Sequence, residues 1–377
     1  MSESIFCPFP FSHTNISTTG SYQICCLHET PKEHVVNINE YPISFWNNSQ
    51  YVNDVKNSFL QEKKHPGCSE CWQNETKGAQ SFRQRVLQEH SIFKIDKNTN
   101  KLTTLEIQLG NLCNLTCLMC DEESSSAILS ENIRLGVNIY PQKKFSWNDE
   151  SFDHLYDILS SGLKMVSIRG GETLYNKKLL TLMQTLPEEI CANIVLHITT
   201  NATIWNEEWE TVIKKFKLVR FMFSIDATDK LYEYIRFPST WKNVESNIKK
   251  ISKLKNVKPM VHCVVQNLNI AKMLDLIIWC QQEKIYLECY SLVQPYYLTI
   301  YNLPTELKKQ AIEHVNQCLV RDNLSKDLVQ FFTNCQQQLT NSLTNFDQNK
   351  WQDFLMYITP RDQIRGNSHK EFLIYES

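Results

Sequence analysis

Short apolar segments alternate with longer amphipathic segments from about residue 103 onwards. The short segments have the length and flanking turn residues of buried strands, whereas the longer ones repeat apolar residues at the three- and four-residue spacing of helices. We expect strands at 103–109, 164–168, 194–199, 219–225, 259–265 and 286–293. Helices are expected at 125–135, 152–163, 178–187, 207–216, 240–254 and 271–284.

This alternation predicts an α/β fold with a parallel sheet. Right-handed crossovers would curl six strand–helix units into a partial (β/α)6 barrel that resembles the TIM barrel without closing. In such a fold the ligand-binding loops follow the carboxyl ends of the strands. Candidate chemistry should therefore lie in those loops.

The two ends of the chain have other patterns. Residues 1–100 carry few strong periodicities and five cysteines, which indicates a small cysteine-rich domain held together by metal. The pattern is helical again at 305–321 and 326–339, while the polar segment 361–377 predicts no particular element. We expect three domains, at 1–100, 101–300 (the barrel) and 301–377 (a helical carboxyl-terminal extension).

Charge and composition exclude some classes of function. The 39 basic and 41 acidic residues give a net charge of -2 without a polybasic run, which argues against nucleic-acid binding by bulk charge. The amino terminus does not have the pattern of a secretory signal, and no apolar run approaches the roughly 20 residues that span a bilayer. We expect a cytoplasmic protein without a membrane partner.

Fourteen cysteines are many for such a protein. Disulfides are rare in a reducing compartment, so ligation of a metal or an iron–sulfur cluster is the leading explanation. Eight lie in the first third of the chain, at Cys7, Cys25, Cys26, Cys68, Cys71, Cys113, Cys117 and Cys120. The other six are expected to be small buried hydrophobic residues: Cys191, Cys263, Cys280, Cys289, Cys318 and Cys335.

The segment GNLCNLTCLMC follows the first expected barrel strand and spaces Cys113, Cys117 and Cys120 as Cys-x3-Cys-x2-Cys. Three thiolates can bind three irons of a 4Fe–4S cluster and leave the fourth iron open to a small molecule. A structural zinc site is the alternative. It would need a fourth ligand, and no histidine follows Cys120 at zinc-finger spacing.

This segment resembles the signature of the radical SAM superfamily. The resemblance implies that S-adenosyl-L-methionine binds the open iron and is cleaved reductively to a 5′-deoxyadenosyl radical, which abstracts a hydrogen atom from a substrate. It also implies an electron donor such as flavodoxin or ferredoxin. Met119 occupies the position of a bulky residue near the adenine in the family, and simple loop packing is its alternative role.

The ends of the second and third barrel strands agree with this resemblance. IRGGETLY is similar to the Gly-Gly-Glu-Pro stretch of the family, which implies that Gly170, Gly171 and Glu172 meet the methionine amino group. Thr173 replaces the usual proline, which leaves the rigidity of this loop open. Asn201 lies in TTNAT, which resembles a Thr-Asn-Gly segment with alanine in place of glycine.

The fourth and fifth strand ends extend the resemblance. Ser224 and Asp226 lie where relatives bind the cofactor ribose, and Arg236 lies where a basic residue pairs with the methionine carboxylate. A surface arginine on a helix is the alternative for Arg236. Gln266 or Asn267 would line the adenine or substrate pocket, or cap a loop.

The amino-terminal cysteines resemble the SPASM and twitch auxiliary-cluster domains. Gly20 precedes one cysteine by five positions, as in that pattern, and this spacing favours Cys25 over its neighbour Cys26. Such domains usually follow the barrel, whereas here the cysteines precede it. The resemblance implies a second 4Fe–4S cluster, and a four-cysteine zinc site remains the alternative. The ligands in either case are Cys7, Cys25, Cys68 and Cys71.

Taken with the resemblance, these residues predict a radical SAM enzyme of the twitch or SPASM type that acts on a peptide or protein side chain. Two alternatives stay open. The first is the same chemistry on a small metabolite, and the second is a non-catalytic binding protein held together by zinc.

Overall fold

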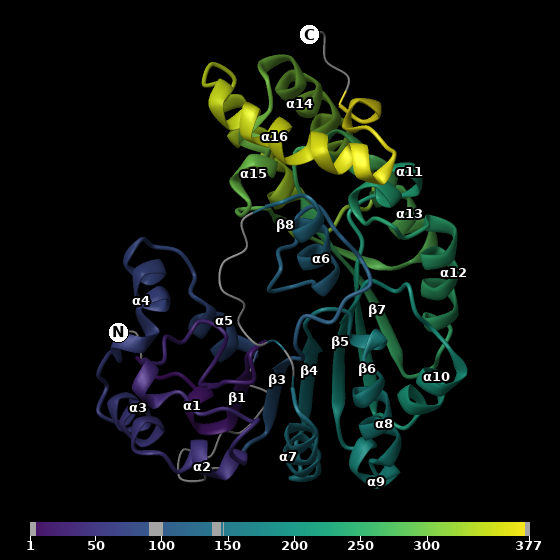
Figure 1. Cartoon of the computed structure of the whole chain (residues 1–377). Helices are drawn as coiled ribbons and strands as arrows, with labels where there is room; N and C mark the ends of the chain where they lie inside the picture. The colour runs from purple at the N-terminus through teal and green to yellow at the C-terminus, as the bar shows by residue number, and fades with distance from the viewer. Residues whose placement is uncertain (1–4, 90–100, 138–144, 146, 374–377) are drawn as a thin grey trace. The chain divides into compact units, whose positions relative to one another are not determined.

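The computed structural model describes residues 5–89, 101–137, 145 and 147–373 (Figure 1). Its eight-stranded sheet has the order β2-β1-β3-β4-β5-β6-β7-β8. β3 pairs with β4, β4 with β5 and β7 with β8 in parallel, which confirms the expected α/β fold class. The six expected strands are β3 (Thr104–Gln108), β4 (Met165–Arg169), β5 (Val195–Thr200), β6 (Leu218–Ser224), β7 (Val257–Val265) and β8 (Tyr286–Ser291).

Two further strands come from the amino-terminal segment. β1 (His13–Ile16) pairs in parallel with β3, with His13 opposite Thr104, and β2 (Tyr22–Gln23) pairs antiparallel with β1. The His13 ring is hydrogen-bonded to the Thr104 hydroxyl, 2.9 Å away. The cysteine-rich segment therefore adds strands to the sheet.

The chain divides into two discontinuous compact units. Unit 1 comprises Met1–Cys113, Tyr140–Thr199 and Asn206–Val219, and unit 2 comprises Asn114–Ile139, Thr200–Trp205 and Arg220–Ser377. β1 pairs with β3 inside unit 1, and the carboxyl-terminal helices belong to the unit that contains β7 and β8. The three expected domains, at 1–100, 101–300 and 301–377, stay a prediction.

Unit 1 has an apolar interior built by alternation along its strands. Ile107, Ile168 and Ile198 are opposite one another in register and are buried, as expected where alternate side chains point to one face. Asparagine side chains cap three helices at Asn148 and Asn176 and Asn206. The helices are α1 (Phe9–Ser12), η1 (Lys32–His34), α2 (Ile43–Asn47), α3 (Gln50–Leu60), η2 (Pro66–Cys68), α4 (Ser69–Thr76), α5 (Phe82–Glu89), α7 (Asp149–Ser160), η4 (Thr173–Tyr175), α8 (Lys177–Thr185), α9 (Glu188–Cys191) and α10 (Glu207–Lys214).

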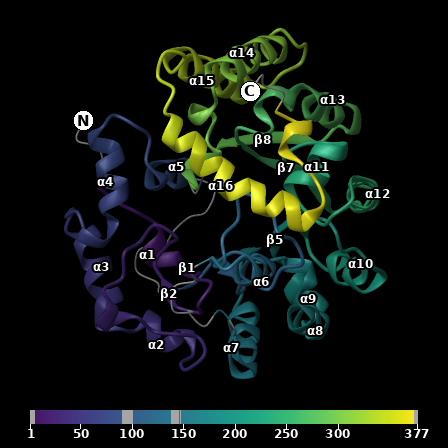
Figure 2. The same cartoon turned by 45° about the horizontal axis from the view of Figure 1, so that its top comes forward.

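Unit 2 combines β7 and β8 with the later helices. α14 (Thr305–Leu319) and α15 (Lys326–Asn341) lie side by side in both views (Figures 1 and 2). Five of the six isolated cysteines lie in this unit and are buried as expected, except for the half-buried Cys289, while Cys191 is buried in unit 1. The remaining helices are α6 (Ser126–Arg134), α11 (Asp229–Ile235), α12 (Trp241–Ile251), η5 (Ile270–Lys272), α13 (Met273–Glu283), η6 (Tyr296–Leu298), η7 (Ile300–Asn302), α16 (Gln348–Arg365) and η8 (His369–Glu371). Within the described ranges, none of the helices has the length and apolarity needed to cross a bilayer.

Candidate functional site

The Gly-Gly-Glu segment after β4 packs against the loop that leads to Cys113. Gly170 and Gly171 both have positive φ, at +102° and +53°. A Cβ atom on Gly171 would collide with the Leu112 carbonyl, and the backbone N–H of Glu172 donates a hydrogen bond to that same carbonyl oxygen at 2.8 Å. Only glycine permits this close approach of the two backbones, so packing within unit 1 explains the glycine pair.

Glu172 and Thr173 fix this segment. The Glu172 side chain is 1% exposed, and its carboxylate accepts a hydrogen bond from the Leu174 backbone N–H at 3.0 Å. The Thr173 hydroxyl donates to the Thr199 carbonyl oxygen at 2.8 Å. Threonine therefore ties the loop to β5 by a hydrogen bond, which supplies a restraint where the family has a proline.

Cys117 and Cys120 belong to unit 2, on a loop that runs beside residues 235–237. The backbone N–H of Thr116 donates to the Phe237 carbonyl at 2.7 Å, and that of Leu118 donates to the Ile235 carbonyl at 3.0 Å. Cys117 is buried, whereas Cys120 is half-buried. The pairing brings Arg236 next to the buried cysteine.

Arg236 and Asp226 form a buried ion pair beside Cys117. The Arg236 Nε donates to Asp226 Oδ2 at 2.8 Å, and its Nη1 lies 3.7 Å from Cys117 Sγ. The pKa of Cys117 is lowered chiefly by its hydrogen bond with Cys120, and the Arg236 charge adds to this against the effect of burial. Cys117 is therefore predisposed to be a thiolate, the form that binds metal.

Asp226 has further protein partners and no exposure. It is 0% exposed, and its Oδ1 accepts the backbone N–H of Val264 at 2.8 Å. The contacts to ribose and to the methionine carboxylate that the resemblance implies for Asp226 and Arg236 stay predictions. In this structure both residues bind other parts of the protein.

The carboxyl-terminal helix α16 contacts the same loop. The Tyr357 hydroxyl donates to the Leu118 carbonyl at 2.7 Å, and Arg365 Nη2 donates to the Thr116 carbonyl at 2.7 Å. Arg365 also forms a buried ion pair with Glu131 of α6 at 2.7 Å. The sequence analysis predicts no element after residue 339, so these long-range contacts could not be anticipated.

Asn201 holds the start of the loop in unit 2. Its Nδ2 donates to Asn114 Oδ1 at 3.0 Å, while its Oδ1 accepts the backbone N–H of Thr203 at 3.0 Å. Ala202 is buried and has a φ of +57°, in the left-handed region that favours the glycine of the family pattern. Asn201 thus positions the residue after Cys113.

The residues that are predicted to bind the cofactor fall into a half-buried group and a buried group. Met119, Gly170, Gly171 and Ser224 are half-buried, and are therefore open to a ligand, whereas Glu172, Asn201, Asp226 and Arg236 are buried. Gln266 is a further candidate because its side chain is 0% exposed and neither amide atom has a hydrogen-bond partner among the described residues. A buried amide without partners is costly, and a bound ligand would satisfy it.

Four of the amino-terminal cysteines line one cavity in unit 1, together with apolar rings and Arg83. Burial raises the pKa of Cys7 and of Cys68 to about 12. Cys26 lies elsewhere, near the Arg169–Glu106 ion pair, whose charges affect its pKa. The four thiols suit the predicted cluster in number and chemistry, and they are Cys7, Cys25, Cys68 and Cys71.

Two histidines that the sequence analysis missed adjoin this cavity. Potential ligand atoms of His28, His65 and Cys68 all lie within 4.8 Å of one another, and His28 Nδ1 is 3.5 Å from Cys68 Sγ. Burial lowers the pKa of His28 to about 4, so its ring is neutral at pH 7. The sequence features that could have identified these histidines are the spacings Cys25-x2-His28 and His65-x2-Cys68.

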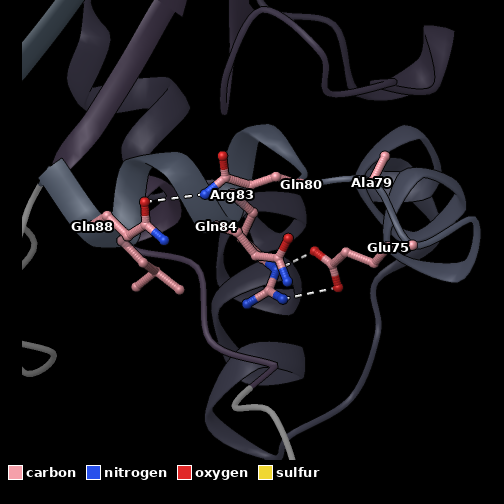
Figure 3. A pocket seen from close by; sticks show the side chains of 8 residues that line it. Glu75, Ala79, Gln80, Arg83, Gln84 and Gln88 are labelled. Atoms are coloured by element: carbon pink, nitrogen blue, oxygen red, sulfur yellow. Dashed lines mark hydrogen bonds and ion pairs between the residues drawn. The ribbon is translucent and has the colours of Figure 1, made fainter. Parts of the chain in front are cut away.

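Arg83 places a fixed cation beside the same cavity. Its Nε and Nη2 donate to the two carboxylate oxygens of Glu75 at 3.0 and 2.9 Å, a forked arrangement visible in Figure 3. Its Nη1 donates to the Phe6 carbonyl at 2.9 Å, and the guanidinium lies 5.1 Å from the Trp72 ring centroid. Arg83 also lines the pocket of Figure 3, so it connects that surface with the thiol cavity.

Comparisons with known proteins support the interpretation of the Cys-x3-Cys-x2-Cys loop. Residues 107–280 match the model of the Radical SAM superfamily. A probable GTP 3',8-cyclase from Methanocaldococcus jannaschii is 24% identical over 229 residues, which cover 57% of this chain and 70% of the relative.

Two solved structures are similar to part of this chain. Native anSMEcpe with bound AdoMet has a TM-score of 0.41 and 19% identity, over 58% of this chain and 60% of that chain. Streptococcus suis SuiB bound to the precursor peptide SuiA has a TM-score of 0.40 and 18% identity, over 74% of this chain and 59% of that chain. The chain thus spans about 60% of the length of these two solved chains. Residues 107–280, which match the model of the Radical SAM superfamily, contain Cys113, Cys117 and Cys120, so this part of the chain has the cysteine loop and the sequence pattern of a radical SAM domain.

Proposed function

We propose that the protein cleaves S-adenosyl-L-methionine reductively and modifies a substrate by hydrogen abstraction. Cys113, Cys117 and Cys120 would hold the 4Fe–4S cluster, which supplies an open iron and an electron for the cleavage. The observation that carries this proposal is the Cys-x3-Cys-x2-Cys loop within the matched domain, with the buried Cys117 next to a cation.

The loops around this site have distinct roles in the proposal. The backbone at Gly170 and Gly171, together with the half-buried Met119 and Ser224, would contact the cofactor. Glu172 and Asn201 are buried and would act by holding the loops in place. This division follows from exposure and from the hydrogen bonds that the Glu172 and Asn201 side chains already make within the protein.

The amino-terminal cavity is the proposed auxiliary site. Four cysteines around one cavity have the ligand number of a closed 4Fe–4S cluster, and the positive charge of Arg83 would offset thiolate charge there. Zinc is the competing metal, because the nearby His28 and His65 are also good zinc ligands. Metal analysis of anaerobically reconstituted protein separates them, since two clusters predict about eight irons per chain and a zinc site predicts about four with one zinc.

The proposed substrate is a peptide or a protein side chain. A small metabolite is the second candidate, and it is favoured by the similarity to a probable GTP 3',8-cyclase. Incubating the reduced holoenzyme with S-adenosyl-L-methionine and either GTP or candidate peptides tests both. A substrate should raise 5′-deoxyadenosine formation and itself change mass.

The activity is tested by changing Cys113, Cys117 and Cys120 together to alanine. The reconstituted variant should form no 5′-deoxyadenosine under reducing anaerobic conditions, while the wild type forms it. A variant with Cys191 changed to alanine is the matched control, because this buried cysteine lies outside both sets of proposed ligands. Undiminished cleavage by the triple variant would refute the proposed function.

A further inference from the structure

Arg236 makes contacts within the protein that differ from those expected of an arginine that binds the cofactor. Arg236 is 6% exposed, and two of its guanidinium nitrogens already bind protein atoms. Nε donates to Asp226 Oδ2, and Nη1 donates to Cys117 Sγ. Forked pairing with a carboxylate uses two neighbouring nitrogens, and each such edge of this guanidinium has one nitrogen already engaged.

The position of Arg236 is set by a rigid frame. Asp226 Oδ1 accepts the Val264 N–H at the end of β7, and the Asp226 carbonyl oxygen accepts Asn269 Nδ2 at 2.9 Å. The backbone on either side of Arg236 accepts hydrogen bonds from Leu118 and Thr116 of the cysteine loop. The arginine is thus held at the thiol by its own main chain and by a buried carboxylate.

We propose that Arg236, fixed by Asp226, is a positioning residue that acts on the catalytic cluster through the Cys117 sulfur and makes the cluster easier to reduce. The inference rests on the proposed function, since it requires a cluster at Cys117. It differs from the contact that the superfamily resemblance implies, which is with the methionine carboxylate.

The physical basis is the charge that reduction adds. An added electron makes the cluster and its thiolates more negative, and a hydrogen bond to a ligating sulfur stabilises that state. A cation in a buried setting contributes more than one in water, because the local dielectric constant is lower. Removal of Arg236 should therefore shift the reduction potential of the cluster to more negative values.

The test compares full-length, anaerobically reconstituted wild type with Arg236→Met and Arg236→Lys. The midpoint potential is measured by redox titration with electron paramagnetic resonance, and the catalytic cluster is recognised by the spectral change on adding S-adenosyl-L-methionine. Equilibrium dialysis gives the affinity for that cofactor. Arg321→Met is the matched control, because Arg321 is exposed and its Nε donates to Gln281.

Arg236→Met should have a more negative midpoint potential and a cofactor affinity within about twofold of wild type. Arg236→Lys keeps a cation and should show a smaller shift of the midpoint potential in the same direction. If the Met variant does not hold iron, the potential of Arg236→Lys tests the inference. An unchanged potential in Arg236→Lys would then overturn the inference. So would an unchanged potential with a cofactor affinity about tenfold weaker in Arg236→Met. Wild-type protein without iron at these cysteines would instead overturn the proposed function.

Discussion

The Tyr357 hydroxyl donates a hydrogen bond to the Leu118 carbonyl oxygen, 2.7 Å away and 239 positions earlier in the chain. This bond joins the helix α16 to the residue directly after Cys117. With the Arg365 bond to the Thr116 carbonyl, it fixes the backbone on both sides of that cysteine. The carboxyl-terminal helix is thus part of the support of the cysteine loop.

Removing the Tyr357 hydroxyl should loosen this loop. Tyr357→Phe loses one buried hydrogen bond and leaves the Leu118 carbonyl without it, so the free energy of unfolding should fall by about 1 kcal/mol. Chemical denaturation measures this, and the iron content after reconstitution should fall with it. Tyr296→Phe is the control, since Tyr296 is 42% exposed and bonds to Asp353. Equal effects in the two variants would argue against a special role for Tyr357.

Gln266 should show opposite effects on stability and activity. Its buried amide has no partner among the described residues, so Gln266→Met removes an unsatisfied polar group and should raise the free energy of unfolding by about 1 kcal/mol. If the amide binds a ligand, 5′-deoxyadenosine formation should fall in the same variant. The exposed Gln348→Met is the control. A stabilised variant of full activity would make Gln266 a simple core residue.

Adjacent Cys25 and Cys26 should differ in their effect on bound metal. Cys25 lines the thiol cavity with the other three cysteines, whereas Cys26 lies near Arg169 and Glu106. Cys25→Ser should therefore lose about half of the bound iron, and Cys26→Ser should keep it. Iron and sulfide analysis after reconstitution measures this, and the reverse result would reassign the ligand.

Metal loading of the amino-terminal site should release protons. Burial raises the pKa of Cys7 and Cys68 to about 12, so both thiols are protonated at pH 8 without metal. Metal binds the thiolate, so affinity should rise with pH, and loading should release about one proton per cysteine ligand. A pH-indicator titration with zinc on the metal-free protein measures this release. Loading without proton release would show that these thiols are already ionised.

The barrel strands were predictable because buried strands carry short, nearly continuous apolar runs. β1 and β2 were missed because strands of four and two residues give no readable period. α16 was missed because Pro360 lies inside it and a polar segment follows, which together indicate a helix end. The partners of Asp226 and Arg236 depend on segments far apart in sequence, so the pattern could predict their positions after β6 but not their contacts.

The proposed cluster at Cys113, Cys117 and Cys120 should have one iron without a protein ligand. Electron paramagnetic resonance of the reduced, reconstituted protein before and after addition of S-adenosyl-L-methionine tests it most directly. One 4Fe–4S signal should change when the cofactor is added and should disappear in the triple cysteine variant. The absence of any cluster signal that responds to the cofactor would contradict this expectation.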